Sequence, residues 1–226
     1  MLRERLSPEI SEFLRYLAAH EEAESRLPTL NELSRELGIG VAALREQLEV
    51  ARALGLVEVK PGTGMRRKPY TFTPAVMKSL DYALALNKDH FLAFADLRRH
   101  VEMAYWHEAV KLLTQEDRAK LKYLVACAWE KLKGSPIEIP HPEHRELHLT
   151  IYNRLNNPFV SGLLYAYWDA YETVGLNFFT DYNYLTGVWQ YHQKMVDSIC
   201  ENDIEAGYKA LSEHSDLIYQ LISSSQ

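Results

Sequence analysis

The stretch LPTLNELSRELGIGVAALREQLEVARALGLVEVKPGTG, residues 27–64, decides the fold of the N-terminal part of the chain. Thr29, with Glu32 three residues later, forms a capping-box pattern that begins a helix, and Gly38 ends that helix because glycine accepts a left-handed backbone. After this turn, residues 41–54 repeat apolar side chains every three or four positions. The pattern predicts two short helices joined by a glycine turn.

The second half of the same stretch reads as a hairpin. Residues 56–60 alternate apolar and polar side chains like a half-buried strand, and residues 61–64 form a turn whose glycines permit positive φ. An amphipathic helix precedes the stretch, with Ser7 as its cap and Pro8 at its first position. Helices followed by a hairpin with a glycine-rich tip predict a winged helix-turn-helix, whose second helix fits a major groove about 12 Å wide.

Charge and prolines separate this region from the rest of the chain. The whole chain carries a net charge of −6, which by itself argues against nucleic-acid binding. Residues 26–70 carry 8 basic and 5 acidic side chains, a local balance of +3, and residues 66–68 are all basic. Because this basic, proline-containing stretch ends near residue 74, we expect a winged helix-turn-helix domain with its linker over residues 1–74 and a second domain over residues 75–226.

The second domain is predicted to be all helical. Helical spacing recurs through it, strand alternation is absent, and the breaks between helices are short, which is typical of an antiparallel bundle. The protein is therefore expected to be mainly α. The predicted helices cover residues 75–88, 91–114, 116–133, 142–155, 159–175, 185–201 and 203–222.

Other features limit the environment of the protein. No run of apolar residues approaches the ~18 needed to span a membrane, and the N-terminus lacks the apolar core of a secretory signal. Cys127 and Cys200 lie in apolar helical patterns and are read as packed thiols. We therefore expect a cytoplasmic protein with no membrane partner.

Four of the nine histidines have informative spacing. His144 and His148 are four residues apart, so their side chains are neighbours on one helical face. His192 and His214 lie eleven residues before and after position 203, so an antiparallel pair of helices would bring them to the same height. Three helices could thus direct four imidazoles to one point, as metal sites in helical bundles commonly do. The plainer reading is a set of packed, hydrogen-bonded histidines.

The N-terminal part also resembles a known family. Residues 27–29, 44–46 and 54–57, together with the Pro-Gly-Thr-Gly turn, look like the DNA-binding domain of GntR-family bacterial transcription regulators. The resemblance implies double-stranded operator DNA as partner, a homodimer, Arg45 at the recognition helix and a wing near the minor groove. The DNA-binding candidates are Thr29, Arg35, Arg45, Lys60, Gly62, Thr63 and Arg66.

This sequence departs from the family pattern at three positions. The start of the recognition helix has Gly40 and Val41 where Ser or Thr and then Arg are common, and Asn31 replaces a frequent basic residue. Fewer phosphate contacts predict weaker or more salt-sensitive binding, or an unusual operator. A winged helix that serves only protein interaction is the alternative.

The C-terminal part resembles the all-helical ligand-binding domain of the FadR subfamily. The similarity rests on His148, Asn157-Pro158, His192, residues 203–206 and His214. It implies a divalent metal site made by an Asp and three His, with a small carboxylate metabolite bound beside the ion. His144 stands at the Asp position, so the implied metal ligands are His144, His148, His192 and His214. Imidazole donors suit Zn²⁺ or Ni²⁺ better than Mg²⁺ or Ca²⁺. Glu143 or a water could complete the shell if His144 points elsewhere.

The effector candidates are Arg98, Glu102 and Tyr152. Arg98 and Glu102 match the subfamily's Arg-x-x-x-Glu and form either a solvated helix salt bridge or a pair in which Arg98 grips a carboxylate inside the cavity. Tyr152 belongs to a set of aromatic residues that are mostly core. Three other histidines of this part, His100, His107 and His141, are interpreted as surface or capping residues.

These observations predict a ligand-responsive, dimeric transcription regulator and not an enzyme. One alternative is a metal-free regulator that senses a larger apolar effector. Another is a metal-dependent hydrolase, since an open position on an ion could activate water. No positioned general base accompanies the histidine pair, because Glu146 falls on a different helical face.

Overall fold

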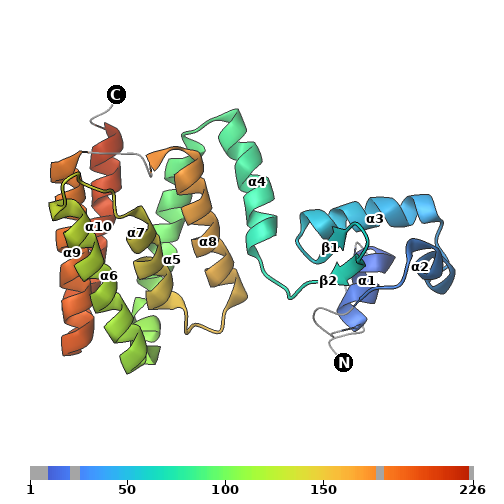
Figure 1. Ribbon diagram of the computed structural model, residues 1–226, viewed down its shortest axis with the longest axis horizontal. Helices are drawn as coiled ribbons and strands as arrows, with labels where there is room; N and C mark the ends of the chain where they lie inside the picture. Colours follow the sequence, from blue (N-terminus) through green and yellow to red (C-terminus); the bar gives the residue numbers. More distant parts are fainter. Residues whose placement is uncertain (1–9, 21–25, 177–180, 224–226) are drawn as a thin grey trace. The chain divides into compact units, whose positions relative to one another are not determined.

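The structure, a computed structural model, describes residues 10–20, 26–176 and 181–223, with side chains as far as residue 217. Contacts divide the chain into two compact units, Met1–Lys78 and Ser79–Gln226. The division falls within helix α4, Thr73–Leu86, whereas the sequence predicts a domain boundary near residue 74. The fold is mainly α, as predicted, with ten helices and one two-stranded sheet in the part of the chain that is described (Figure 1).

Three helices form the N-terminal unit together with the sheet. They are α1, Glu12–Ala19, α2, Leu30–Leu37, and α3, Val41–Ala53. The predicted capping box begins α2, and Gly38 ends it at φ 68°. The apolar faces of all three helices and the sheet share one core, formed by Phe13, Leu17, Leu27, Leu33, Leu44, Leu48, Ala51, Val57 and Met65.

The first helix begins later than the sequence predicts. Ser7 and Pro8 lie outside the described residues, and α1 starts at Glu12, where the Ser11 side chain accepts a hydrogen bond from the third helical amide. The backbone amide of Phe13 donates to Gln47 Oε1 at 2.9 Å, which ties α1 to α3.

The predicted hairpin is present and has an additional partner. Strand β1, Val57–Lys60, pairs antiparallel with β2, Gly64–Arg67, and Gly62 in the turn has φ +79°. Arg26 forms a further antiparallel bridge with Arg66, which the sequence reading did not predict. The wing is therefore attached at its base to the chain that leads into α2.

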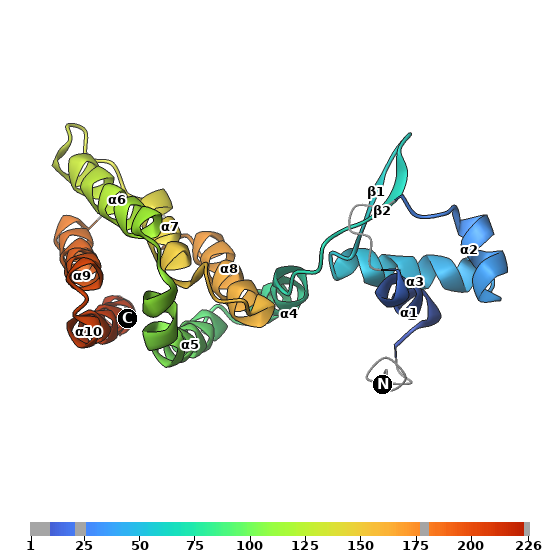
Figure 2. The same ribbon diagram turned by 90° about the horizontal axis from the view of Figure 1, so that it is seen from below.

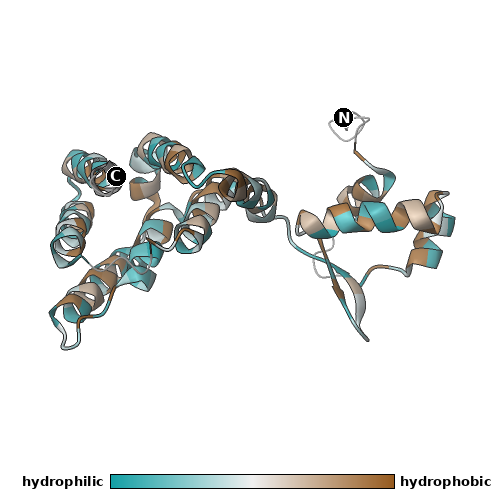
Figure 3. Ribbon diagram, turned by 90° about the horizontal axis from the view of Figure 1, so that it is seen from above, coloured by the Kyte–Doolittle hydropathy of each residue, from teal (hydrophilic) through white to brown (hydrophobic). Residues whose placement is uncertain are grey.

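Six long helices make up most of the C-terminal unit, which has no strand among its described residues. Helix α10 packs along α9 and α5, α6 packs against α7 and α9, and α8 packs against α5 and α7 (Figures 1 and 2). Their predicted positions are confirmed, with ends that differ by a few residues. Hydrophilic and hydrophobic residues both occur along these helices (Figure 3). The bounds are α5, His90–Leu112; α6, Gln115–Lys133; α7, His141–Tyr152; α8, Pro158–Thr173; α9, Tyr182–Glu201; and α10, Ile204–Ser223.

Two polar contacts fix how the helices of this unit meet. The fully buried Trp106 on α5 donates from Nε1 to the backbone oxygen of Ile204 at 3.0 Å, at the start of α10. Asp117 in the first turn of α6 accepts from Arg154 Nε at 2.8 Å, just after α7. Because these contacts join residues far apart in sequence, they set the register of the helices around the interior.

No described helix is long and apolar enough to cross a membrane. The two cysteines, Cys127 and Cys200, are free and partly buried.

Candidate metal centre and nucleic-acid interface

The helical unit brings the four predicted histidines to one point. His144 and His148 come from successive turns of α7, His192 from α9 and His214 from α10. Each offers a ring nitrogen, and these four nitrogens lie within 4.8 Å of one another. We call these residues the four-histidine cluster. The α9–α10 hairpin turns at Asn202, which has φ 60°, and therefore places His192 and His214 at the same height, as the spacing predicts.

The rings of the cluster face one another closely. His148 Nε2 lies 3.1 Å from His192 Nε2, and the ring centroids of His192 and His214 are 4.3 Å apart. His144 is 4.6 Å from His192 by the same measure. Three ring nitrogens in the cluster are buried without a hydrogen-bond partner: His144 Nε2, His192 Nδ1 and His214 Nδ1. Such orphaned nitrogens are rare in protein interiors and call for an explanation.

Burial keeps these imidazoles neutral. It lowers the pKa of His144, His192 and His214 well below the usual value for histidine, and repulsion from neighbouring imidazoles and Arg98 lowers it further. The pKa of His148 is also lowered by burial and by Arg98, against the opposing effect of Glu102. A neutral imidazole retains the lone pair that a metal ligand needs.

The ion pair of Arg98 and Glu102 lies beside His148 and is buried. The prediction that these two residues form a solvated salt bridge is therefore wrong. Arg98 Nε lies 2.8 Å from Glu102 Oε2, with side-chain exposures of 7% and 0%. Burial alone would raise the pKa of Glu102, but Arg98 and His148 outweigh the effect of burial and hold this pKa below its usual value. The Arg98 guanidinium also lies over the Tyr167 ring, 4.6 Å from its centroid.

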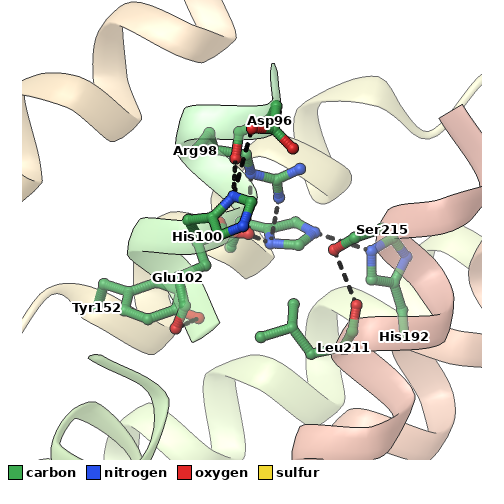
Figure 4. A network of polar contacts seen from close by, with 9 residues as sticks. Asp96, Arg98, His100, Glu102, Tyr152, His192, Leu211 and Ser215 are labelled. Carbon is green, nitrogen blue, oxygen red and sulfur yellow. Dashed lines mark hydrogen bonds and ion pairs between the residues drawn. The ribbon is translucent and has the colours of Figure 1, made fainter. Parts of the chain in front are cut away.

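This pair contacts the cluster directly (Figure 4). Glu102 Oε1 lies 3.1 Å from His148 Nδ1, and Arg98 Nη2 lies 2.7 Å from the same nitrogen. Because a guanidinium only donates and a carboxylate only accepts, Nδ1 can satisfy one of them at a time. A proton on Nδ1 is donated to Glu102 and leaves Nε2 as a bare lone pair facing His192.

Tyr152, the third effector candidate, is engaged elsewhere. Its hydroxyl donates to the backbone oxygen of Glu102 at 2.9 Å and joins α7 to α5. The ring is almost fully buried. It lines a cavity of about 110 Å³ between α7 and α8 and is absent from the lining of the pocket that reaches His144.

Glu143, the alternative to His144 as a ligand, is not among the residues whose ligand atoms converge. Its Oε1 accepts from Lys131 Nζ at 2.6 Å. His144 instead stands edge-on to Trp168, with ring centroids 4.6 Å apart. The structure therefore supplies no role for Glu143 at the cluster.

A small pocket leads to His144 from the outside of the unit. It measures about 10 Å³, room for about one water molecule. His141, Tyr171, Tyr184 and Trp189 line it together with His144. The sequence reading placed His141 at the surface or in a cap, which is wrong, because its side chain is only 14% exposed. Its position three residues before His144, at the start of the same helix, could have indicated this.

The N-terminal unit has a groove between α2, α3 and the hairpin. Its volume is about 950 Å³, and its lining includes Thr29, Arg45 and Gly64. Arg45 is exposed on α3. Thr29 also caps α2, since its Oγ1 donates to Glu32 Oε2 at 2.7 Å. The groove thus lies between the two helices and the hairpin.

The other DNA-binding candidates lie around this groove but do not line it. Arg35 Nε donates to the backbone oxygen of Asn31 at 3.2 Å, and Lys60 Nζ lies 2.9 Å from Glu58 Oε2. Gly62 and Thr63 are exposed at the tip of the wing, and Arg66 is exposed on β2.

The chain thus combines a winged helix-turn-helix unit with an all-helical unit. Residues 93–217 match the FCD domain family, and the chain belongs to that family as a GntR-type transcription regulator with an FCD effector-binding domain. These relatives carry the names of regulators and not of enzymes. Their names argue against the metal-dependent hydrolase that the sequence analysis gave as an alternative.

Two curated relatives cover most of the chain. The protein named "Putative L-lactate dehydrogenase operon regulatory protein" from Escherichia coli is 23% identical over 97% of this chain and 87% of its own length. "Uncharacterized HTH-type transcriptional regulator YcbG" from Bacillus subtilis is also 23% identical, over 85% of this chain and 78% of its own.

Solved structures show the same fold. Streptococcus agalactiae GntR superimposes with a TM-score of 0.68 at 17% identity, over 92% of this chain and 95% of that one. E. coli McbR/YncC gives a TM-score of 0.51 at 19% identity, over 96% of this chain and 99% of that one.

Proposed function

We propose that this regulator binds operator DNA as a dimer through its N-terminal unit, and that a divalent metal and a small carboxylate held in the helical unit control this binding. The observation that carries the proposal is the four-histidine cluster, whose ring nitrogens lie within 4.8 Å of one another. Effector control requires unequal affinity of the ligand for two states of the protein.

The donor set fits a borderline divalent cation. Zn²⁺ binds imidazole nitrogen at about 2.0–2.1 Å, so two adjacent nitrogens on one ion would lie roughly 2.8–3.4 Å apart in octahedral or tetrahedral geometry. The 3.1 Å separation of His148 Nε2 and His192 Nε2 is of this size. A bound ion would also account for the buried nitrogens of His144 and His214 that lack a partner. His144, His148, His192 and His214 would hold Zn²⁺ or Ni²⁺.

Glu102 supports His148 in this role. Metal-binding histidines usually donate a hydrogen bond from their second ring nitrogen to a carboxylate or carbonyl, and this bond orients the ring and raises its basicity. Glu102 Oε1, 3.1 Å from His148 Nδ1, is placed to accept that hydrogen bond. Arg98 in turn neutralises the buried carboxylate. The Arg98–Glu102 pair thus acts on the effector site through His148.

Electrostatics favours an anionic effector. The four imidazoles are neutral, and the charge of Arg98 is offset by Glu102. A bound divalent ion would supply an uncompensated positive charge to which a carboxylate oxygen could bind. The name of the E. coli relative refers to the L-lactate dehydrogenase operon, and a hydroxy acid of that size is within the proposed class.

Metal content tests the helical unit. Wild-type protein incubated with Zn²⁺ and desalted should retain about one ion per chain, whereas His192→Phe should retain much less. His100→Phe is the control, because that imidazole is 70% exposed and pairs with Asp96 away from the cluster. Wild-type protein that retains no ion would contradict the metal site and favour a metal-free sensor.

Operator binding tests the N-terminal unit. Arg45→Ala should weaken binding to promoter DNA by about 5- to 150-fold, because a specific contact to a base contributes about 1–3 kcal/mol. Arg52→Ala is the control on the same helix, since Arg52 pairs with Glu49 at 2.7 Å and does not line the groove. Equal losses in both variants, or none, would contradict the role of Arg45. Size measurement in solution tests the dimer.

A further inference from the structure

His141 is a histidine of the pocket that belongs to neither the cluster nor the surface. It begins α7, three residues before His144, and both residues line the same small pocket. Its imidazole stacks on the Tyr171 ring, with centroids 5.5 Å apart and planes inclined by 4°. The side chain is 14% exposed. Its ring is therefore part of the pocket wall.

The outer edge of this ring is fixed by a charged network. His141 Nε2 lies 3.0 Å from Glu172 Oε1 on α8. Arg145, one turn after His141, donates from Nη1 to the same oxygen at 3.1 Å and pairs with Asp169 through Nη2 at 2.8 Å. Because a carboxylate only accepts, Nε2 must donate to Glu172. The proton of a neutral imidazole is thereby held on Nε2.

The second nitrogen of the ring has no partner. His141 Nδ1 is buried and has no hydrogen-bond partner. With the proton on Nε2, this nitrogen is an acceptor. A buried acceptor without a donor is costly, so a ligand that brings a donor to it gains affinity.

We propose that His141 is a specificity-determining residue of the effector pocket, and that its Nδ1 accepts a hydrogen bond from a hydroxyl group of the effector. This inference rests on the proposed function, because it assumes that a carboxylate binds beside the cluster. The ligand class is a short carboxylic acid with a hydroxyl group near its carboxylate. The pocket has room for about one water molecule, so its wall must move apart to admit even a compact acid.

Calorimetric titration with a matched pair of acids tests the proposal. Glycolate and acetate differ only in one hydroxyl group, and each is titrated into Zn²⁺-loaded full-length protein whose metal content has been measured. Wild-type protein should bind glycolate about tenfold more tightly, the factor expected when one hydrogen bond satisfies a buried acceptor. His141→Phe keeps a ring against Tyr171 but removes both nitrogens, so this preference should vanish while acetate affinity is unchanged.

Two further variants separate recognition from structure. His141→Asn places an amide atom two bonds from Cβ, where Nδ1 stands, and should restore part of the preference. His107→Phe is the matched control, because His107 also pairs with a glutamate, Glu205, and lies beside a tyrosine, but on the exposed surface. This control should keep the full preference.

The outcomes distinguish this inference from the proposed function. Equal affinities for the two acids in wild-type protein, or a preference that survives in His141→Phe, would overturn the role of His141 and leave carboxylate binding intact. Wild-type protein that retains Zn²⁺ but binds neither acid would overturn carboxylate sensing, and the role of His141 with it.

Discussion

Replacing Glu102 with glutamine removes one charge from the interior without changing the size of the side chain. Arg98 is 7% exposed and has Glu102 as its ion-pair partner at 2.8 Å. Breaking a buried ion pair from one side costs about 3–5 kcal/mol, because a buried charge is left uncompensated. We expect Glu102→Gln to lower the free energy of unfolding of the metal-free helical unit by about this amount.

The same change should weaken metal binding. A neutral amide at position 102 accepts a weaker hydrogen bond from His148 Nδ1 than a carboxylate does. Loss of such a supporting group commonly reduces metal affinity by about 10–100-fold. The lower part of this range is expected here, because the glutamine oxygen can still accept the bond.

The double variant Arg98→Met, Glu102→Gln separates the two effects. It removes the uncompensated charge and should recover most of the lost stability, since exchange of a buried pair for uncharged groups is often nearly neutral. It should not recover metal affinity, because the carboxylate beside His148 is still missing.

Urea unfolding in EDTA measures the stability of the helical unit through tryptophan fluorescence, because all four tryptophans of the chain lie in that unit. Competition with a chromophoric chelator measures metal affinity. The reasoning would be refuted if Glu102→Gln unfolded within about 0.5 kcal/mol of wild type, a difference typical of an ordinary surface substitution, and kept its metal affinity. A double variant as unstable as the single one would contradict the charge argument alone.

Further expectations concern stability. Gly207→Ala should cost about 1–3 kcal/mol in urea unfolding, because the added methyl would lie 2.7 Å from Trp106 Cζ2; Gly187→Ala, which meets nothing within 4 Å, should be neutral or stabilising, and equal effects would disprove the contact. Without metal, the free energy of unfolding should fall as the pH drops below about 6.5, by up to about 1.4 kcal/mol per pH unit for each cluster imidazole. The reason is that the unfolded chain then takes up protons that the buried neutral rings do not. A urea midpoint that stays constant between pH 7 and 5.5 would contradict this. The pKa of Asp117 is depressed, because hydrogen bonds from Arg154 and Thr114 outweigh the opposing effect of burial. The stabilising contribution of this carboxylate is therefore present above pH 4 and is lost as the pH falls further. Asp117→Asn should flatten the dependence of the unfolding free energy on pH below pH 4, and an unchanged profile would refute the assignment.

Local sequence patterns predicted much of the fold, because the start and end of most helices depend on residues that are close together in the sequence. The capping box at Thr29 and the glycine at position 38 bound α2 as expected, and short breaks located all the helices of the second unit. The start of α1 was missed because both Ser7 and Ser11 are suitable caps, and the contact of Phe13 with Gln47 on α3 is invisible to a local pattern.

The convergence of the four histidines could be predicted, because the spacing of residues along a helix determines which side chains are neighbours. An i,i+4 pair on one helix and a symmetric pair across a helical hairpin suffice to bring four imidazoles together. The burial of Arg98 and the place of His141 depend on which face of α5 and α7 turns inward, which is decided by packing against α8. Such tertiary choices cannot be read from the spacing of one helix.

An anomalous difference map from crystals of the Zn²⁺-loaded protein, recorded at the zinc edge, tests the central claim most directly. We predict one peak per chain, bonded to a ring nitrogen of each of His144, His148, His192 and His214 at about 2.0–2.1 Å. A peak outside the cluster, or four rings that keep separate protein partners with no ion between them, would contradict it.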